Sequence, residues 1–187
     1  MKGNAQFILD FLAKDPKSGY LMTGPSISPE NWFRTAGGEE MVASMMPACD
    51  RELAYEILSN CVRASEILDT DREFADSLRT AIAQLPPIQL RANGAIREWF
   101  EDFEEAHPNH RHTSHLLALY PFPRSLWRRL PNWRKLPVRL SRIVCLPKTE
   151  DTEWSRANMI CMYARLKDAQ EAYKSVQLLQ GKLHVKI

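Results

Sequence analysis

Hydrophobic residues recur at helical spacing in several segments of this chain, and this pattern predicts its main elements. The first segment is about Lys2 to Ala13, whose apolar side chains fall on one stripe. That stripe consists of Phe7, Ile8, Phe11 and Leu12. A second helix is predicted from Asp50, which can cap it, to about Leu68. Since no stretch alternates apolar and polar residues over several strands, we predict an all-α fold.

The predicted helices form antiparallel hairpins, because short turns join them. Thr70 and Glu73 fit a capping box that begins a helix, and Pro86 and Pro87 end it. Only a minimal turn separates this helix from the one that ends near Leu68. The two helices therefore form the first predicted hairpin.

A second hairpin is predicted near the end of the chain. Its helices cover Asp151 to Leu166 and Asp168 to Gln180, with Asp168 as N-cap and Gly181 in the C′ position. A further, acid-rich helical piece is predicted from Ile96 to Phe103. We see no sequence repeat of fixed period.

A long irregular segment, Lys17 to Glu40, lies between the first two predicted helices and contains a short strand predicted at Tyr20 to Thr23. Its sequence GYLMTGPSISPEN carries a single carboxylate, Glu30. Spacing alone favours the interpretation that Pro29 and Glu30 open a short helix, where the dipole stabilises a carboxylate. The alternative is a catalytic acid whose pKa is raised by nearby aromatic rings, an environment that also suits a sugar. These rings are Tyr20, Trp32 and Phe33.

Composition places the chain among ordinary globular proteins, since 44% of its 187 residues are hydrophobic and 26% are charged. This length fits one domain. No apolar run approaches the roughly 20 residues that span a bilayer, so we predict no transmembrane helix and no membrane partner. The charges in the opening segment also argue against a secretory signal peptide.

The cysteines and histidines show no spacing typical of a metal site. The four cysteines are far apart and contain no CxxC pair, so we predict free buried thiols. The loop HPNHRHTSH has four histidines without an HExxH motif, so we predict no metal and no cofactor. Five acids at 98–105 are interpreted as a solvated face, one of which could pair with Arg111.

Several linked motifs carry a resemblance to a known family. They occur in the order MKGNAQFILDFLAKDPKSGYLMTGPSISPEN, REWFEDFEE, HRHTSHLLALYP and WSRANMICMYARLKDAQEAY. Together they resemble the catalytic domain of glycoside hydrolase family 95, the inverting α-L-fucosidases. The resemblance implies part of an (α/α)6 toroid of helical hairpins. Residues 1–187 would then be a single partial catalytic domain and an internal fragment of it.

The resemblance also implies roles for individual residues. Glu30 corresponds to the general acid of the SPEN motif, and Asn31, His110, His112 and Trp154 are carried over as substrate contacts. Two departures lie nearby, since Asn109 and Glu153 stand where Gly is common in the family. The implied ligand is a fucosylated oligosaccharide or glycan, and the linkage and the choice between L-fucose and L-galactose stay open.

The resemblance further implies that the chain alone is inactive. In the family an Asp motif, assisted by a pair of Asn residues, directs the attacking water, and neither motif is present in this sequence. Apolar helix faces without neighbours would favour self-association. Full-length relatives are expected to be secreted or periplasmic, which leaves the location of this chain unknown.

The segment 121–149 departs from the family, which has an acidic, Ala-rich helix at this place. Its eight Lys and Arg residues carry a formal charge of +8, so the rest of the chain, whose total net charge is +2, has a net charge of −6. One interpretation is a non-catalytic helical module that binds nucleic acid or another acidic partner there. Pro131 and Pro137 spoil a helix and disfavour nucleic acid. Another interpretation of the segment is a shifted reading frame. Nucleotides that encode Leu126 to Val138 can give SLEETPELAEAAR, an amphipathic helix, when they are read one position along.

Overall fold

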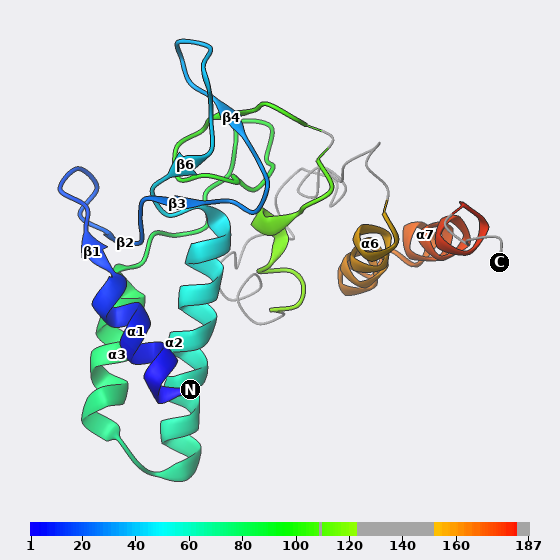
Figure 1. Ribbon diagram of the computed structural model, residues 1–187. Helices are drawn as coiled ribbons and strands as arrows, with labels where there is room; N and C mark the ends of the chain where they lie inside the picture. The colour runs from blue at the N-terminus through cyan, green and yellow to red at the C-terminus, as the bar shows by residue number, and fades with distance from the viewer. Residues whose placement is uncertain (109, 123–151, 183–187) are drawn as a thin grey trace.

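Two helical hairpins and a further helix make up about half of the fold, as the computed structural model shows for residues 1–108, 110–122 and 152–182 (Figure 1). Five α-helices lie in these ranges. They are α1 (Lys2–Phe11), α2 (Ala48–Leu68), α3 (Arg72–Gln84), α6 (Glu153–Leu166) and α7 (Ala169–Lys182), and a 3₁₀ turn, η1, covers Ser114–Leu116. The two predicted hairpins, α2–α3 and α6–α7, are both present. That these hairpins form part of an (α/α)6 toroid stays a prediction.

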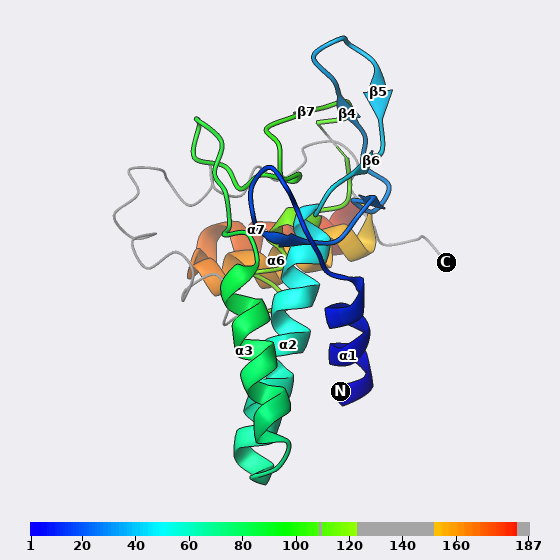
Figure 2. The same ribbon diagram turned by 90° about the vertical axis from the view of Figure 1, so that its left-hand side faces the viewer.

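The helices α1, α2 and α3 lie side by side and share one core (Figure 2). Ala5, Leu58 and Leu78 are fully buried where the three helices meet. The predicted caps are wrong in detail, because α2 follows Pro47 as N-cap and α3 follows Asp71, neither with a side-chain capping bond. Asp50 lies instead in the first turn of α2. Its carboxylate accepts a hydrogen bond of 2.6 Å from the Thr23 hydroxyl, which ties the irregular segment to α2.

The α6–α7 hairpin confirms one predicted cap and corrects another. The Asp168 carboxylate accepts the backbone N–H of Glu171 at 3.1 Å, as the sequence predicts. Gly181 lies inside α7 and does not end it. The start of α6 carries a capping box that the sequence analysis missed, since Thr152 and Ser155 exchange side-chain to backbone hydrogen bonds.

Short strands correct the prediction of an all-α fold. Each strand has two residues, and all pairs are antiparallel. The pairs are β1 (Ala13–Lys14) with β2 (Leu21–Met22), β3 (Ser26–Ile27) with β6 (Ala43–Ser44), and β4 (Phe33–Arg34) with both β5 (Glu40–Met41) and β7 (Glu104–Glu105). The predicted strand at Tyr20 to Thr23 is confirmed by β2. Two residues are too short to show alternation, so the other strands left no pattern in the sequence.

The segment Ile96–Phe103 is not the predicted helix. It runs as an irregular chain in which Trp99 is buried at 1% exposure. Phe33 of β4 stacks on Phe103 at 4.1 Å between ring centroids and packs against Trp99 at 5.3 Å. These aromatic contacts with β4 hold the segment in a conformation that its local helical pattern does not predict.

A second core joins η1 to α6 and so sets the position of the histidine loop. Leu116 and Leu119 pack with Met162 and Leu166 of α6. All four side chains are buried. The loop that leads into η1 therefore lies against α6.

Other sequence predictions have mixed outcomes. Apart from Pro121 and Phe122, the basic stretch 121–149 lies outside the described residues, so its proposed partners are not tested. Cys49, Cys61 and Cys161 are free thiols, and Cys61 is buried as predicted, whereas Cys49 and Cys161 are only partly buried. Within the described ranges, no helix has both the length and the apolar composition of a bilayer-spanning segment.

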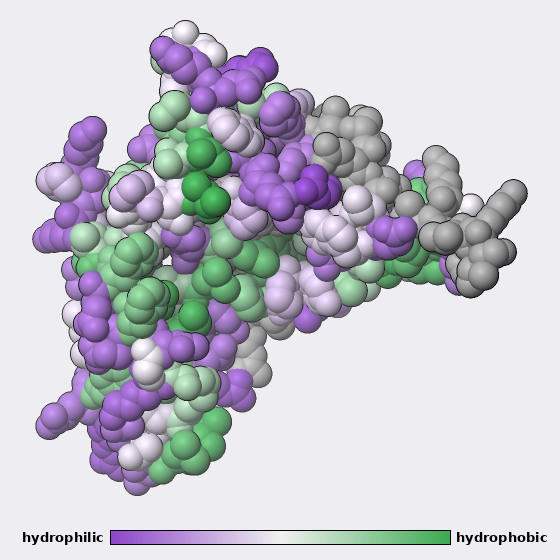
Figure 3. Space-filling view, viewed as in Figure 1, coloured by the Kyte–Doolittle hydropathy of each residue, from purple (hydrophilic) through white to green (hydrophobic). Residues whose placement is uncertain are grey.

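Hydrophobic residues gather on the side of the molecule where α1 lies and at the α2–α3 turn (Figure 3). On α1 the rings of Phe7 and Phe11 stack at 5.9 Å and are 63% and 46% exposed.

We expect the chain to self-associate through this face of α1, because exposed adjoining aromatic rings favour association. Replacing both by Ser should shift the chain toward monomer in size-exclusion chromatography with light scattering. Tyr173→Ser, which removes an exposed aromatic ring of α7, is the control that should change little. A monodisperse wild-type monomer would contradict the prediction.

Candidate active site

Glu30 occupies a tight turn that projects its carboxylate from the protein surface. The Asn31 N–H donates to the Ser28 carbonyl at 3.1 Å, with Pro29 second and Glu30 third in the turn. Glu30 has φ of 52°, a left-handed value that type II turns require at the third position and usually fill with Gly. The first-turn helix interpretation of Pro29 and Glu30 is therefore wrong. Strained backbone of this kind is often found at functional sites.

Two basic side chains converge on one oxygen of the Glu30 carboxylate. The Arg111 guanidinium donates to Oε2, and Nε2 of His112 lies 3.1 Å from the same oxygen. The Glu30 side chain is 59% exposed. The hydrogen bond from His112 and the charge of Arg111 hold the pKa of Glu30 below its ordinary value.

The expected rise of the Glu30 pKa through aromatic burial is therefore wrong for this structure. Tyr20 packs edge-on against Phe100 at 6.3 Å, and Phe33 is buried against Trp99. These contacts place both rings in the core. Trp32 is 42% exposed. Glu30 is left in contact with solvent, the His112 hydrogen bond and the Arg111 charge, and these keep its carboxylate charged.

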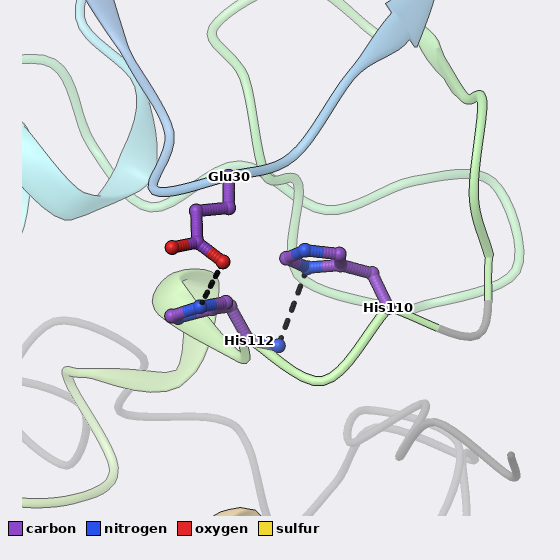
Figure 4. A group of neighbouring side chains, drawn as sticks. All are labelled: Glu30, His110 and His112. Atoms are coloured by element: carbon purple, nitrogen blue, oxygen red, sulfur yellow. Dashed lines mark hydrogen bonds and ion pairs between the residues drawn. The ribbon is translucent and has the colours of Figure 1, made fainter. Parts of the chain in front are cut away.

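The histidine loop brings two of the predicted substrate contacts, His110 and His112, together near Glu30 (Figure 4). Nδ1 of His110 accepts the backbone N–H of His112 at 3.2 Å, and the two rings stack at 5.0 Å. On its other side His112 meets Trp154 of α6, with 4.9 Å between ring centroids. The side chains of Glu30, His110, His112 and Trp154 thus form one cluster built from three distant parts of the sequence.

Asn31 is the last residue of the Glu30 turn. It is 2% exposed, and its Oδ1 accepts the backbone N–H of Trp32 at 3.0 Å. These bonds give Asn31 a role in the turn, and its predicted contact with substrate stays a prediction.

A buried acid–base pair lies below the cluster. One oxygen of Glu98 accepts from the Ser28 hydroxyl, and the other accepts from Nδ1 of His115. Burial opposes ionisation of Glu98, but the His115 charge and the hydrogen bonds outweigh it and hold the pKa below the ordinary value. Burial likewise opposes the charge on His115, and the Glu98 carboxylate outweighs it and raises the His115 pKa. Both effects stabilise an ion pair.

Comparison with known proteins gives the family of the chain. Residues 1–186 match the family described as "Glycosyl hydrolase family 95 catalytic domain". The chain belongs to this family. It is 34% identical over 177 residues to "Alpha-L-fucosidase 2" of Arabidopsis thaliana, and the aligned region covers 94% of this chain and 20% of that protein. The chain therefore spans about a fifth of the length of this relative.

The family 95 assignment confirms the resemblance drawn from the linked motifs. It also runs through the basic stretch 121–149, which the sequence analysis set apart. The assignment gives no role to any single residue, so the acid and substrate-binding roles stay predictions. What the structure adds is the placement of four of the five predicted site residues in one cluster.

A shallow hollow of about 120 Å³ opens beside this family 95 cluster, with His112, Trp154 and Asn158 in its wall. An exposed ring next to hydrogen-bonding groups is a surface that suits a sugar. A larger hollow of about 680 Å³ lies on α2 and α3 around Tyr55 and includes none of the predicted site residues. The smaller one is therefore the better candidate.

The same cluster has the ligand types of a metal site. Glu30, His110 and His112 offer ligand atoms within 4.8 Å of one another. However, Arg111 already occupies the Glu30 oxygen, and the Nδ1 lone pair of His110 accepts the His112 N–H. A cation bound at Oε2 of Glu30 and Nδ1 of His110 would have to compete with both contacts, and the nearby charge of Arg111 would oppose it.

Sequence analysis missed two contributors to the site. Arg111, interpreted from the sequence as a possible partner of the acid run, donates to Glu30. Glu98 was assigned to a solvated face and is 5% exposed, whereas Glu101, Asp102 and Glu104 are exposed as predicted. No local pattern distinguishes Glu98 from its neighbours, because its burial follows from the packing of Trp99.

The buried pair predicts a pH-dependent stability. His115→Ala should lower the free energy of unfolding by about 3 to 5 kcal/mol, because it leaves the Glu98 carboxylate buried without its cation. In the wild type, the Glu98 contribution is lost as pH falls below 4.5 through its lowered folded pKa. The His115 contribution is complete below pH 6.5 and is lost as pH rises through its raised folded pKa.

The cost of His115→Ala should therefore be largest between these limits, as measured by urea unfolding at a series of pH values. Exposed His107→Ala is the control and should cost little at any pH. A cost of His115→Ala that does not vary with pH would contradict the ion pair.

Proposed function

We propose that this chain contributes the general acid and part of the sugar pocket to an α-L-fucosidase-like glycoside hydrolase. The reaction is the inverting hydrolysis of terminal α-L-fucosides of oligosaccharides. The observation that supports this best is the cluster in which exposed Glu30 meets His112, with Trp154 against the same imidazole ring. Family membership and the name of the Arabidopsis relative point the same way.

Glu30 is the acid that protonates the departing glycosidic oxygen. An inverting glycosidase uses such an acid on one face of the sugar and a group that directs water on the other, about 6.5 to 9.5 Å away when both are carboxyls. Glu30 has the exposure that a bound glycoside requires. Glu98 cannot take the second role, because it is buried and its oxygens are bonded to Ser28 and His115.

The sugar lies against Trp154, and its hydroxyls meet the histidine loop. An aromatic face covers the apolar side of a pyranose, while imidazole nitrogens exchange hydrogen bonds with hydroxyl groups. Binding there brings hydroxyls to Arg111 and His112, the two groups that hold Glu30 ionised. When the sugar takes over these donors, the pKa of Glu30 rises toward the range in which it can donate a proton.

Glu30→Gln tests the acid in a longer protein that contains this chain. Its kcat for a fucoside with a poor leaving group should fall by about 10² to 10⁴, since the amide cannot donate the proton. A fucoside whose leaving group departs as a stable anion should lose much less. Unchanged hydrolysis of both substrates would contradict the assignment of Glu30.

Proton NMR of the first product formed tests inversion, because inverting hydrolysis of an α-fucoside releases β-L-fucose.

We propose that the 187-residue chain alone is inactive, because the Asp motif that directs water in the family is absent from its sequence. Incubation of the purified chain with an aryl α-L-fucoside should release no aryl alcohol above the rate of a Glu30→Gln control. Release by the wild-type chain that Glu30→Gln abolishes would contradict this proposal.

A further inference from the structure

The carboxylate of Glu98 holds two loops that meet at the proposed acid. We propose that Glu98 is a positioning residue which, with Ser28 and His115, sets the distance between the Glu30 turn and the histidine loop. The catalytic consequence of this inference rests on the proposed function, whereas the contacts of Glu98 do not.

The first arm of the contact fixes the Glu30 turn. Ser28 is fully buried, and its hydroxyl donates to Oε1 of Glu98 while its carbonyl accepts the Asn31 N–H at 3.1 Å. Glu30 lies between these two anchored residues with its positive φ. The direction of the Glu30 side chain therefore depends on where Glu98 holds Ser28.

The second arm fixes the histidine loop. His115 lies three residues after His112, in η1, and donates from Nδ1 to Oε2 of Glu98. The intervening chain is short and hydrogen-bonded, since the Leu116 N–H donates to the Thr113 carbonyl at 2.9 Å. A shift of His115 would therefore move His112 relative to Glu30.

Glu98 is itself anchored to the helical part of the fold. Its backbone carbonyl accepts the N–H of Ala48, the first residue of α2, at 2.8 Å. Its neighbour Trp99 is buried at 1% exposure. Glu98 therefore fixes both loops relative to α2, in the way that a scaffold supports functional residues carried by loops.

The other charges around His115 do not make this connection. Glu105 and Arg51 act on His115 electrostatically, and burial raises the pKa of Glu105. Arg51 pairs with adjacent Glu52 of the same helix at 2.8 Å, so this buried ion pair joins no two loops. Ser28 and His115 donate to the two oxygens of Glu98, and this places Glu98 between the loops.

The test is the titration of the Glu30 carboxyl by carbon-13 NMR in the 187-residue chain. Two variants loosen the contact: Ser28→Ala removes one donor, and Glu98→Gln removes the charge that holds His115. In both, the pKa of Glu30 should move up toward its ordinary value, because Arg111 and His112 no longer stay on its oxygen. Glu105→Gln is the control, since it removes a nearby carboxyl that holds neither loop, and the Glu30 titration should stay as in the wild type.

A purely structural role for Glu98 predicts a different result. The variants would then lower the unfolding free energy while the Glu30 titration of the folded protein stays unchanged, and this outcome overturns the proposal. If Glu98→Gln does not fold, the Glu30 titration in Ser28→Ala alone tests the proposal. Loss of folding in Ser28→Ala also overturns the proposal, because it would make the group part of the core.

The titration does not involve hydrolysis, so it separates this inference from the proposed function. An unchanged Glu30 titration with intact fucosidase activity in a longer protein would overturn only the positioning role. A shifted titration with no effect of Glu30→Gln on hydrolysis would overturn only the assignment of the acid.

Discussion

A buried carboxylate is the constraint on which the candidate site depends. Moving a charge out of water is costly unless hydrogen bonds and an opposite charge replace the water. Glu98 meets this requirement with Ser28 on one oxygen and His115 on the other. Because these donors belong to segments far apart in the sequence, satisfying the carboxylate brings those segments together. The exposed cluster around Glu30 is built on this buried layer.

Helical spacing predicted the hairpins well, because each helix is long enough for its stripe to repeat. It failed at Ile96–Phe103, where the conformation is decided by Trp99 and Phe103 packing against Phe33, some 60 to 70 residues earlier in the chain. It failed also for strands of two residues, which are too short for period two to appear. In both cases contacts distant in sequence determine local structure, and a single sequence does not display them.

The candidate site, too, could be predicted from the sequence only in part. Glu30, His110, His112 and Trp154 could be predicted because they lie in motifs whose order carries a family resemblance. Arg111 stands inside one of these motifs, yet spacing does not reveal that its guanidinium reaches Glu30. The pKa of Glu30 could not be predicted either, because neighbouring aromatic residues in the sequence suggested burial. In the fold Tyr20 and Phe33 pack in the core and leave the carboxylate in water.

The lowered pKa of Glu30 bears on how a general acid can begin its reaction. An acid with a carboxylate held by Arg111 and His112 is ionised at neutral pH and has no proton to give. In the proposed complex, however, the same two donors face the hydroxyls of the sugar. Transfer of these hydrogen bonds from Glu30 to the sugar removes what stabilises the carboxylate, and burial under the ligand adds to the effect. Under the proposed function, binding of the substrate and protonation of Glu30 are then linked, so that the acid gains its proton in the complex in which the proton is used.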